Sequence, residues 1–363
     1  MRRLRVLIVD DSVVMRRMIS DMVQSDPALE VAGIAHHGYI ALAKIAQISP
    51  DIVTLDLDMP EMDGLETLAR LRAEHPDLPV IIVSALTERG TQLTLDALAM
   101  GASDYVTKPS GVMPNAASVA EVRAELLGKI KSLGAAHLSR SPGRSRKHAV
   151  PAEDSAHARV EIVVIGVSTG GPNALMQLLP AIPTDFPVPL VVVQHMPPMF
   201  TRFLAERLEK VCSLKVREAA EGDKIEAGTI WIAPGDYHLE MVRTQRDVLV
   251  RLNQGPLENS CRPAVDPTFR SAVECYGSRV LGVIMTGMGH DGLQGSRCIY
   301  DGGGQILAQD EKTSVVWGMP RFVVEEGLPD EVLPLDRIAA GIRQRVSVGR
   351  PAPAEVHVEV PKT

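Results

Sequence analysis

The sequence predicts an α/β protein built from two domains in succession. Twice along its 363 residues, short apolar runs alternate with stretches of helical periodicity, and 45% of the residues are hydrophobic. A chain of this length exceeds one ordinary domain, and alternating strands and helices are typical of parallel sheets covered by helices. We therefore expect domains at 1–125 and 159–348, a linker at 126–158 and a disordered tail at 349–363.

The first domain is predicted to contain a parallel sheet with five strands. The strand cores are apolar runs separated by amphipathic stretches, and they lie at 6–9, 31–35, 52–55, 80–83 and 105–106. Met15, Met18 and Met22 recur at helical spacing between the first two strands. We interpret these methionines as core residues rather than as part of a cofactor site, because methionine readily fills irregular gaps in a core.

Polar residues follow the ends of these strands. Asp10 and Asp11 close the first strand, Asp56 closes the third, and Ser84 and Lys108 follow the fourth and fifth. The carboxyl ends of strands in an open parallel sheet meet at one crevice. Crowded carboxylates repel one another unless a hard cation or an ammonium group neutralises them. The combination therefore predicts a Mg²⁺ site, although any one of these aspartates alone is more typical of a solvated helix cap.

Taken together, these positions resemble the receiver domain of two-component response regulators, a flavodoxin-like (βα)5 fold. The matching motifs, in order, are Asp10-Asp11, 55–60, Asp63-Gly64, Ser84-Ala85 and Lys108-Pro109. The resemblance implies that a histidine kinase supplies a phosphoryl group to Asp56. It also implies that Mg²⁺ is held by Asp11, Asp56 and the backbone carbonyl of Asp58, with Asp10 acting through water.

The resemblance further implies a conformational switch. A phosphoryl group adds about −1.5 to −2 charges, toward which Ser84 and Lys108 can move. Lys108 would then bind the phosphoryl oxygens. Tyr105 lies near the same sheet edge, and it is either the aromatic residue of the switch or an ordinary half-buried strand residue.

The second domain is predicted to be a doubly wound, Rossmann-like α/β sheet with an antiparallel hairpin. We expect buried strands at 162–167, 190–195, 229–234 and 280–285. Helices are expected at 200–211 and 266–276, and the hairpin at 237–253. Between the domains, 139–148 combines clustered basic residues with Ser, Pro and Gly and has no periodicity. That composition is typical of a solvated linker.

A sharp strand-to-helix turn organises this second domain. The apolar run 162–167 ends at Ser168, and glycines at 170 and 171 allow backbone conformations that a Cβ would forbid. Such a turn presents Ser168 beside the free N–H groups of a helix start, which suits a nucleophile. The Gly-x-Ser-x-Gly spacing is a weak match to a nucleophile elbow. A phosphate-binding loop, which lacks its glycine or lysine here, and a turn without chemistry stay open as alternatives.

A serine nucleophile needs a base, and the base needs a group that orients it. His195 ends an apolar strand, so it should emerge at the same sheet edge as Ser168, whereas His238 lies in the hairpin. His290 is a neighbour of Asp291 and cannot easily face that carboxylate and Ser168 together. We therefore expect His195 to serve Ser168 and Asp291 to orient His195. The order Ser, His, Asp disfavours the α/β-hydrolase fold.

Five spaced blocks of this domain look like the catalytic domain of the bacterial chemotaxis protein-glutamate methylesterase family, CheB. They lie at 165–172, 194–196, 232–236, 286–292 and 316–320, and a receiver-like domain precedes them. The resemblance implies demethylation of glutamate methyl esters on methyl-accepting chemoreceptors and deamidation of receptor glutamines. It also implies that the receiver restrains the active site until Asp56 is phosphorylated.

On this resemblance, Ser168 is the nucleophile, His195 the base and Asp291 the orienting carboxylate. Backbone N–H groups of Thr169 and Met288, both in glycine-rich loops at the same edge, are expected to bind the oxyanion. The ester reaction needs no cofactor. A different esterase substrate stays open as an alternative, because no feature of the sequence alone identifies a receptor helix as the substrate.

Composition argues against several other classes of protein. A net charge of −7 and the lack of a basic recognition helix disfavour nucleic-acid binding. No apolar run approaches 18 residues and no signal sequence is evident, so we expect a cytoplasmic protein without membrane insertion. The cysteines show neither a C-x-x-C pair nor dense spacing, which predicts reduced thiols, and they are Cys212, Cys261, Cys275 and Cys298.

Overall fold

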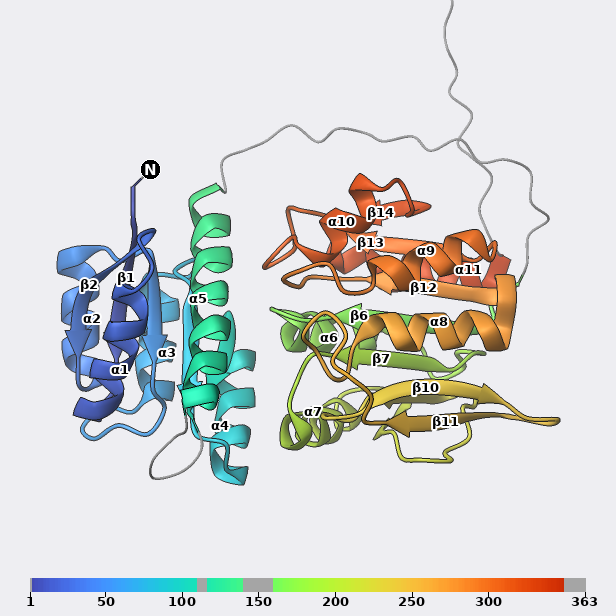
Figure 1. Ribbon diagram of the computed structural model, residues 1–363, viewed down its shortest axis with the longest axis horizontal. Coiled ribbons are helices and arrows are strands. Elements are labelled where there is room, and N and C mark those ends of the chain that lie inside the picture. The colour runs from blue at the N-terminus through green and yellow to red at the C-terminus, as the bar shows by residue number, and fades with distance from the viewer. Residues whose placement is uncertain (1, 110–115, 140–158, 349–363) are drawn as a thin grey trace, which may run out of the picture.

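Two α/β domains lie side by side in the structure, a computed structural model (Figure 1). It describes residues 2–109, 116–139 and 159–348. The N-terminal domain holds a five-stranded sheet, and the C-terminal domain holds a seven-stranded sheet and a separate two-stranded one. Both predicted α/β domains are therefore confirmed. The predicted tail at 349–363 lies outside the described residues.

The N-terminal sheet is parallel and has the strand order β2-β1-β3-β4-β5. Its strands are β1 (Leu4–Val9), β2 (Leu29–Ala35), β3 (Ile52–Leu55), β4 (Val80–Ser84) and β5 (Asp104–Thr107). The helices between and after them are α1 (Val13–Gln24), α2 (Gly38–Ile48), α3 (Gly64–Glu74), α4 (Glu88–Ala99) and α5 (Ala116–Ser139). The strand order reverses between β1 and β3, so their carboxyl ends form the crevice where ligands bind in such sheets.

Helix α5 extends the N-terminal domain past residue 125, where the sequence predicts its end. Residues 126–139, predicted as the start of the linker, are helical. Leu126, Ile130 and Leu133 are buried in one cluster with strand residues of the first sheet. That packing stabilises a helix which Gly128 and Gly134 weaken locally, since glycine has a low helix propensity. The rest of the predicted linker, 140–158, lies outside the described residues.

The C-terminal sheet is parallel and has the order β14-β13-β12-β6-β7-β9-β8. Its strands are β6 (Ile162–Val167), β7 (Leu190–Gln194), β8 (Lys215–Glu218), β9 (Thr229–Ile232), β12 (Val280–Ile284), β13 (Gln305–Gln309) and β14 (Glu331–Leu333). Strands β10 (His238–Arg243) and β11 (Val248–Asn253) pair antiparallel and confirm the predicted hairpin. The chain reverses its direction of winding at β6, which places the end of this strand at the switch point.

Helices cover both faces of this second sheet. They are α6 (Gly171–Leu178), α7 (Pro198–Glu209), α8 (Val265–Tyr276), α9 (Leu293–Asp301), α10 (Met319–Glu325) and α11 (Leu335–Val348), with short 3-10 turns η1 (Leu179–Ala181) and η2 (Gly277–Arg279). No helix of the described residues has the length and apolar character needed to cross a membrane. All four cysteines are free thiols, as predicted.

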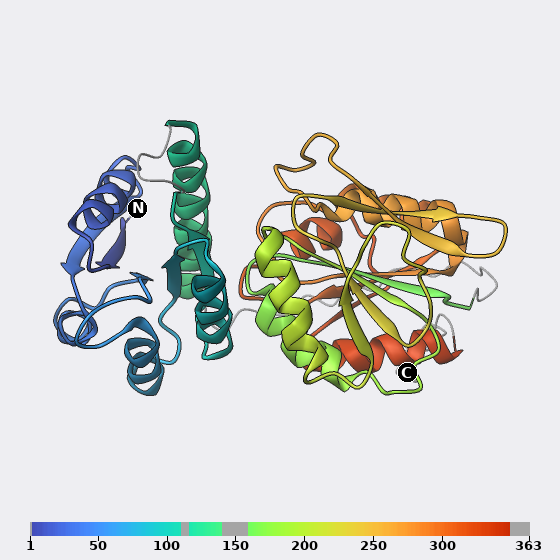
Figure 2. The same cartoon turned by 90° about the horizontal axis from the view of Figure 1, so that it is seen from below.

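The domains meet along α4, β5 and α5 of the first and along α6, α7 and nearby loops of the second (Figures 1 and 2). Arg207 of α7 lies 2.5 Å from Asp96 of α4 in an ion pair. The Tyr105 ring stacks on the Phe200 ring with centroids 4.4 Å apart and an interplanar angle of 11°. A Cβ built on Gly128 of α5 would lie only 3.2 Å from Met288 Cε. The first domain therefore covers the loops at the carboxyl edge of the second sheet.

Candidate active site

Ser168 lies in the turn between β6 and α6, at the switch point of the C-terminal sheet. Its backbone N–H donates to the Thr286 carbonyl at 3.0 Å, and its carbonyl accepts from Gly171 N at 2.8 Å. The Gln194 side chain donates to the same carbonyl at 3.0 Å. Gly170 has a φ of 77°, a conformation that favours glycine, and it is the N-cap residue directly before α6. These contacts fix a half-buried serine beside a helix start.

The loop after β12 approaches Ser168 closely. A Cβ on Gly287 would lie 2.9 Å from Ser168 Cβ, so a side chain at that position would push the loop away from the serine. No described residue accepts a hydrogen bond from the backbone N–H of Thr169 or of Met288. Thr286 Oγ1 donates to the Thr169 carbonyl at 2.9 Å and holds the two loops together. The backbone N–H groups of Thr169 and Met288 therefore have no hydrogen-bond partner in the described part of the chain.

His195 and Asp291 are in direct contact. His195 comes directly after β7, and its Nε2 lies 2.8 Å from Asp291 Oδ2. The Asp291 carboxylate also accepts from backbone N–H groups at the start of α8, from Val265 at 2.6 Å and from Asp266 at 3.2 Å. Burial acts to raise the pKa of Asp291, but the imidazole and the backbone donors outweigh it and lower the pKa to about 2.

Asn259 and Asp266 lie beside Asp291, and neither was predicted from the sequence. The Asn259 amide donates from Nδ2 to Asp291 Oδ1 at 2.8 Å and to Asp266 Oδ2 at 2.9 Å. Burial, together with the charge of Asp291, raises the pKa of Asp266 to about 6. The amide of Asn259 therefore joins two neighbouring carboxylates that would otherwise repel each other.

The second ring nitrogen of His195 contacts a cysteine instead of Ser168. His195 Nδ1 lies 3.4 Å from Cys261 Sγ. Among the residues that the structure describes, no hydrogen bond joins Ser168 Oγ to His195. Burial acts to lower the pKa of His195, but Cys261 and Asp291 outweigh it and raise the pKa to about 10. The predicted contact between His195 and Asp291 is therefore present, whereas the predicted hydrogen bond between Ser168 and His195 is not formed among the described residues.

The other two histidines of this domain have different surroundings. His238 is 3% exposed at the start of β10, its Nε2 lies 2.9 Å from the Pro256 carbonyl, and its Nδ1 faces Ala264 N at 3.3 Å. Both ring nitrogens are therefore used in holding the backbone. His290 is exposed, and its ring centroid lies 5.8 Å from that of Phe322.

The acidic crevice of the N-terminal domain contains the predicted cluster. Lys108 Nζ lies 2.7 Å from Asp56 Oδ2 and 3.0 Å from Asp10 Oδ2. Carboxylate oxygens of Asp10, Asp11 and Asp56 come within 4.8 Å of one another. An all-oxygen set at this spacing fits Mg²⁺. Burial raises the pKa of Asp56 to about 6 in spite of the neighbouring Lys108 ammonium.

The remaining residues predicted for this crevice point in several directions. Ser84 is buried, and its Oγ lies 3.2 Å from the Gly90 carbonyl of α4. The exposed Asp58 side chain pairs with Arg89 at 3.4 Å. Tyr105 is 5% exposed and stacks against α7 of the other domain. It is therefore a residue of the domain interface and more deeply buried than a half-buried strand residue.

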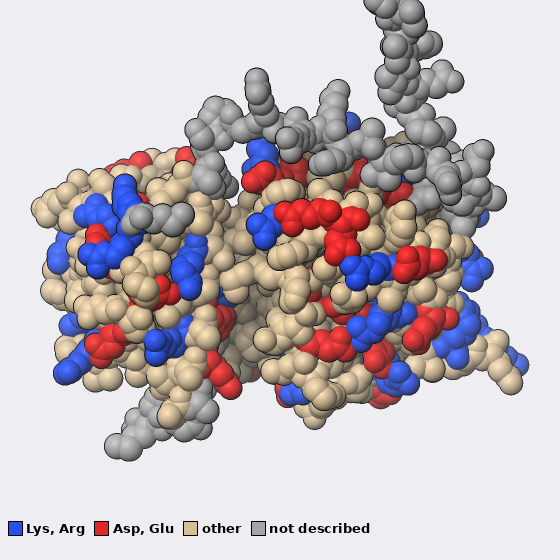
Figure 3. Space-filling model, turned by 45° about the horizontal axis from the view of Figure 1, so that its top comes forward, with Lys and Arg blue, Asp and Glu red and all other residues tan. Residues whose placement is uncertain are grey.

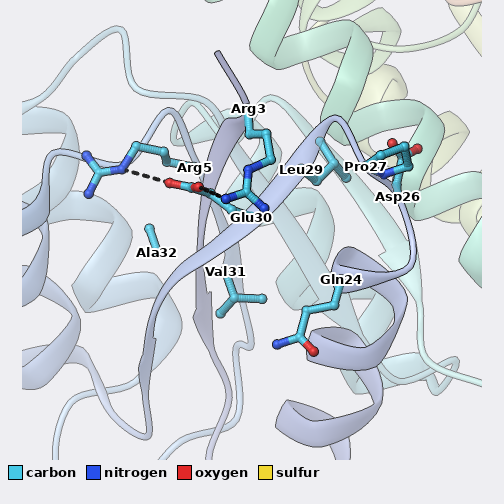
Figure 4. Close-up of a pocket in the computed structure, with 9 residues that line it drawn as sticks. All are labelled: Arg3, Arg5, Gln24, Asp26, Pro27, Leu29, Glu30, Val31 and Ala32. Carbon is cyan, nitrogen blue, oxygen red and sulfur yellow. Dashed lines mark ion pairs between the residues drawn. The ribbon is translucent and has the colours of Figure 1, made fainter. Parts of the chain in front are cut away.

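Two hollows border the described residues. One lies between the domains and is lined by Ser132 and Ala135 of α5 and by Met288, Trp317 and Phe322 of the second domain, among others. The other lies at the amino ends of β1 and β2, where Glu30 faces both Arg3 and Arg5 at 3.2 and 3.5 Å (Figure 4). None of the candidate site residues lines this second hollow, whereas Met288 lines the first. Of these two hollows, only the first therefore adjoins candidate catalytic groups.

Acidic and basic side chains alternate over the face drawn in Figure 3, without a continuous basic stripe. Arg202 pairs with Glu88 at 3.1 Å across the domain boundary, and Arg270 pairs with Glu258 at 2.7 Å within the second domain. Oppositely charged side chains therefore neighbour one another both across the domain boundary and within the second domain.

Fold and sites together define a class of protein: a phosphorylation-type receiver domain joined to an α/β domain with serine, histidine and aspartate at one sheet edge. Comparison with known families agrees with this class. Residues 6–114 match the response regulator receiver domain, and residues 163–342 match the CheB methylesterase domain. The chain belongs to the CheB methylesterase family.

Individual relatives support this membership over nearly the whole chain. A protein-glutamate methylesterase/protein-glutamine glutaminase of Trichodesmium erythraeum is 48% identical over 351 residues, which span 95% of this chain and 100% of that protein. One of a Nocardioides species is 47% identical, over 96% of this chain and 97% of that protein. The crystal structure of the Thermotoga maritima CheB methylesterase catalytic domain is 45% identical, with a TM-score of 0.50. It covers 52% of this chain and 99% of that domain.

Proposed function

We propose that the protein is a phosphorylation-regulated serine hydrolase of bacterial chemotaxis. It demethylates glutamate methyl esters on methyl-accepting chemoreceptors and deamidates receptor glutamines. Its relatives are named protein-glutamate methylesterase/protein-glutamine glutaminase, which supports both reactions. The observation that carries this proposal is the convergence of Ser168, His195 and Asp291 from β6, β7 and the loop after β12. These three strands are neighbours in the sheet, so their carboxyl ends open on one site.

The reaction follows from the two nitrogens of His195. Nε2 faces Asp291, so Nδ1 is the nitrogen that takes the proton of Ser168 as its oxygen attacks the ester carbonyl. His195 then returns the proton to the leaving methanol, or to ammonia where the substrate is a glutamine. Water hydrolyses the acyl-enzyme by the same steps. Asp291 holds the imidazole and stabilises its positive charge.

The oxyanion of each tetrahedral intermediate is bound by backbone N–H groups of Thr169 and Met288. Both groups lack a partner among the described residues, and their loops meet at Gly287 beside Ser168. Donors that are already in place cost no reorganisation when the charge develops. The esterase reaction uses no cofactor.

The test of this function is methanol release from membranes that carry methylated chemoreceptors. Ser168→Ala should lower the rate by on the order of 10³-fold or more, because the nucleophile is lost. Ser314→Ala removes a buried serine whose hydroxyl donates to the Asp310 carbonyl and to no other described residue, and it should release methanol at a rate close to that of the wild type. Equal rates for Ser168→Ala and wild type would refute the nucleophile. If neither acts on receptors, another esterase substrate takes precedence.

The receiver carries the regulatory half of the proposal. Asp56 accepts a phosphoryl group from a chemotaxis histidine kinase, and Lys108 binds the phosphoryl oxygens. Mg²⁺ would be held by Asp11, Asp56 and the Asp58 carbonyl, with Asp10 acting through water, and it would neutralise charge during phosphoryl transfer. The clustered carboxylate oxygens of this crevice support that assignment. We place the protein in the cytoplasm, where such a kinase draws on ATP.

In Asp56→Asn, a small phosphodonor with Mg²⁺ should no longer accelerate methanol release, because an amide cannot form the acyl phosphate. Chelating Mg²⁺ from the wild-type protein should remove the acceleration as well. Asp58→Ala serves as the matched variant, since only the backbone of that residue is assigned to the metal and its exposed side chain pairs with Arg89. Acceleration that survives in Asp56→Asn would show that the phosphoryl group acts elsewhere.

Restraint of the esterase follows from the position of the receiver. Its α5 lies against Met288, and β5 and α4 contact α7 beside His195. A receptor segment cannot approach Ser168 from that side while the domains stay closed. Phosphorylation then shifts the equilibrium toward a more open arrangement of the two domains.

A further inference from the structure

Cys261 stands at the nitrogen of His195 that the proposed reaction needs. An imidazole has two ring nitrogens, and Asp291 takes Nε2 at 2.8 Å. Nδ1 is then the only nitrogen able to accept the Ser168 proton. In the structure Nδ1 lies 3.4 Å from Cys261 Sγ, and no hydrogen bond to Ser168 exists among the described residues. The cysteine therefore competes with the nucleophile for the base.

The backbone that delivers Cys261 is firmly anchored. Asn259 and Ser260 have φ values of 51° and 64°, which non-glycine residues seldom adopt. Glu258 and Cys261 close this turn by exchanging backbone hydrogen bonds of 3.2 and 2.9 Å. Beyond it, Arg262 pairs with Asp236 through Nη2 at 2.5 Å. Because side chains on both sides of Cys261 are tied down, the approach of its sulfur to His195 is built into the fold.

The charges around this contact favour a proton on the imidazole. The Asp291 carboxylate lies against the far side of the ring, and Asn259 separates it from Asp266. Two nearby carboxylates are neutralised by arginines, because Glu258 pairs with Arg270 and Asp236 pairs with Arg262. The carboxylate of Asp291 therefore stabilises an imidazolium, and an imidazolium in turn stabilises a thiolate.

We propose that Cys261 is a positioning residue for His195, which in the resting protein holds Nδ1 in a thiolate–imidazolium pair and withholds it from Ser168. This inference rests on the catalytic roles proposed above. Release is a proton transfer from Nδ1 to Sγ, which leaves a neutral thiol and a neutral imidazole, and no electrons move. The ring nitrogen is then free to accept the proton of Ser168.

Alkylation of the cysteine tests the pair without any esterase assay. Only a thiolate displaces iodide from iodoacetamide, forming a carbon–sulfur bond, so the rate against pH reports thiolate formation. In the full-length protein, Cys261 should react at pH 6 at least about 10-fold faster than Cys212 and Cys298, the other half-buried cysteines. Peptide mass spectrometry follows each of them in the same sample.

His195→Gln should return the alkylation of Cys261 to the pH dependence of an ordinary thiol, whose pKa is about 8.5. The shape of the pH dependence is the readout, so slow alkylation of a half-buried sulfur does not obscure the result. The same pH dependence for Cys261 in the wild type and in His195→Gln would overturn the proposal.

The second arm measures kcat/KM for methanol release against pH. Cys261→Ser keeps a small polar group but cannot ionise, so kcat/KM should level off just above the ordinary imidazole pKa of about 6.5. The wild-type value should still rise above pH 8, which makes the variant several-fold more active at pH 7. Cys298→Ser, a half-buried cysteine of α9, is the matched control and should follow the wild-type profile.

A purely structural role for Cys261 gives a different result in this second arm. It would lower kcat/KM by one factor at every pH, and either that outcome or superimposable profiles would overturn the proposal. If no protein releases methanol from receptors, the substrate assignment fails by itself. The alkylation result then decides on the thiolate–imidazolium pair.

Discussion

Asp291→Asn is expected to lower kcat/KM for methanol release by about 10³ to 10⁴-fold. Asp291 accepts on both oxygens, at Oδ2 beside His195 Nε2 and at Oδ1 from Asn259 Nδ2. Asparagine offers one accepting oxygen and, in place of the second oxygen, an NH₂ group that can only donate. An amide NH₂ turned toward Nε2 makes that nitrogen the acceptor and leaves the hydrogen on Nδ1, where it blocks proton transfer from Ser168. Turned the other way, the NH₂ meets the Asn259 donor, and the carboxylate charge is lost in either case.

Asp266→Asn is the control for this prediction. Asp266 accepts from Gly295 N at 2.7 Å and from Asn259 Nδ2 at 2.9 Å, and it shares no hydrogen bond with His195. The amide loses one of these bonds but leaves the charge of Asp291 in place, so kcat/KM should fall by less than about 10-fold, the cost of roughly one hydrogen bond. Thermal melting of both variants separates lost folding from lost catalysis. Equal losses in the two variants would contradict an orienting role specific to Asp291.

Much of both sites could be predicted because their residues follow buried parallel strands. Ser168, His195 and Asp291 come after β6, β7 and β12, and a parallel sheet brings the carboxyl ends of neighbouring strands together. Asp10, Asp56 and Lys108 obey the same rule in the first sheet, and the structure joins them within 3.0 Å. A buried strand that is recognised from its β-branched residues therefore places the residues after it at the carboxyl edge of the sheet, without knowledge of tertiary contacts.

The residues that escaped prediction lie where no periodic element fixes them. Asn259 and Cys261 belong to the connection between β11 and α8, and their partners Asp291 and His195 are 32 and 66 positions away in sequence. Asp266 gives a faint signal, because an acidic residue in the first turn of a helix is common. Only the fold shows that its carboxylate neighbours Asp291.

Several strands escaped prediction for a related reason. β8 and β14 are the edge strands of the second sheet, and each is only partly buried, so neither forms a continuous apolar run. β13 is fully buried, but glutamines at both of its ends shorten the apolar run to Ile306–Ala308. The predicted domain end at residue 125 was wrong because the packing of α5 on the first sheet outweighs the low helix propensity of its glycines.

Tyr105→Ala is expected to raise methanol release without phosphodonor by an order of magnitude or more, toward the activated rate. The Tyr105 ring is 5% exposed, stacks on Phe200 at 4.4 Å and lies 5.0 Å from Lys129 Nζ. Truncating a buried aromatic side chain at an interface costs on the order of 2 to 4 kcal/mol, and each 1.4 kcal/mol changes an equilibrium about tenfold. The equilibrium between the closed and the more open arrangement of the domains should therefore shift toward the open one by tenfold or more.

Two variants decide whether the stack itself restrains the enzyme. Tyr105→Phe keeps the ring and should keep the low resting rate, so a high rate in this variant would assign the effect to the hydroxyl group. Phe200→Leu removes the stack from the α7 side and should raise the resting rate as well, although the substitution retains an apolar core residue. If only Tyr105→Ala raises the rate, the effect arises inside the receiver. A rise from both sides of the interface is the result that domain contact alone explains, because α7 takes no part in the acidic crevice.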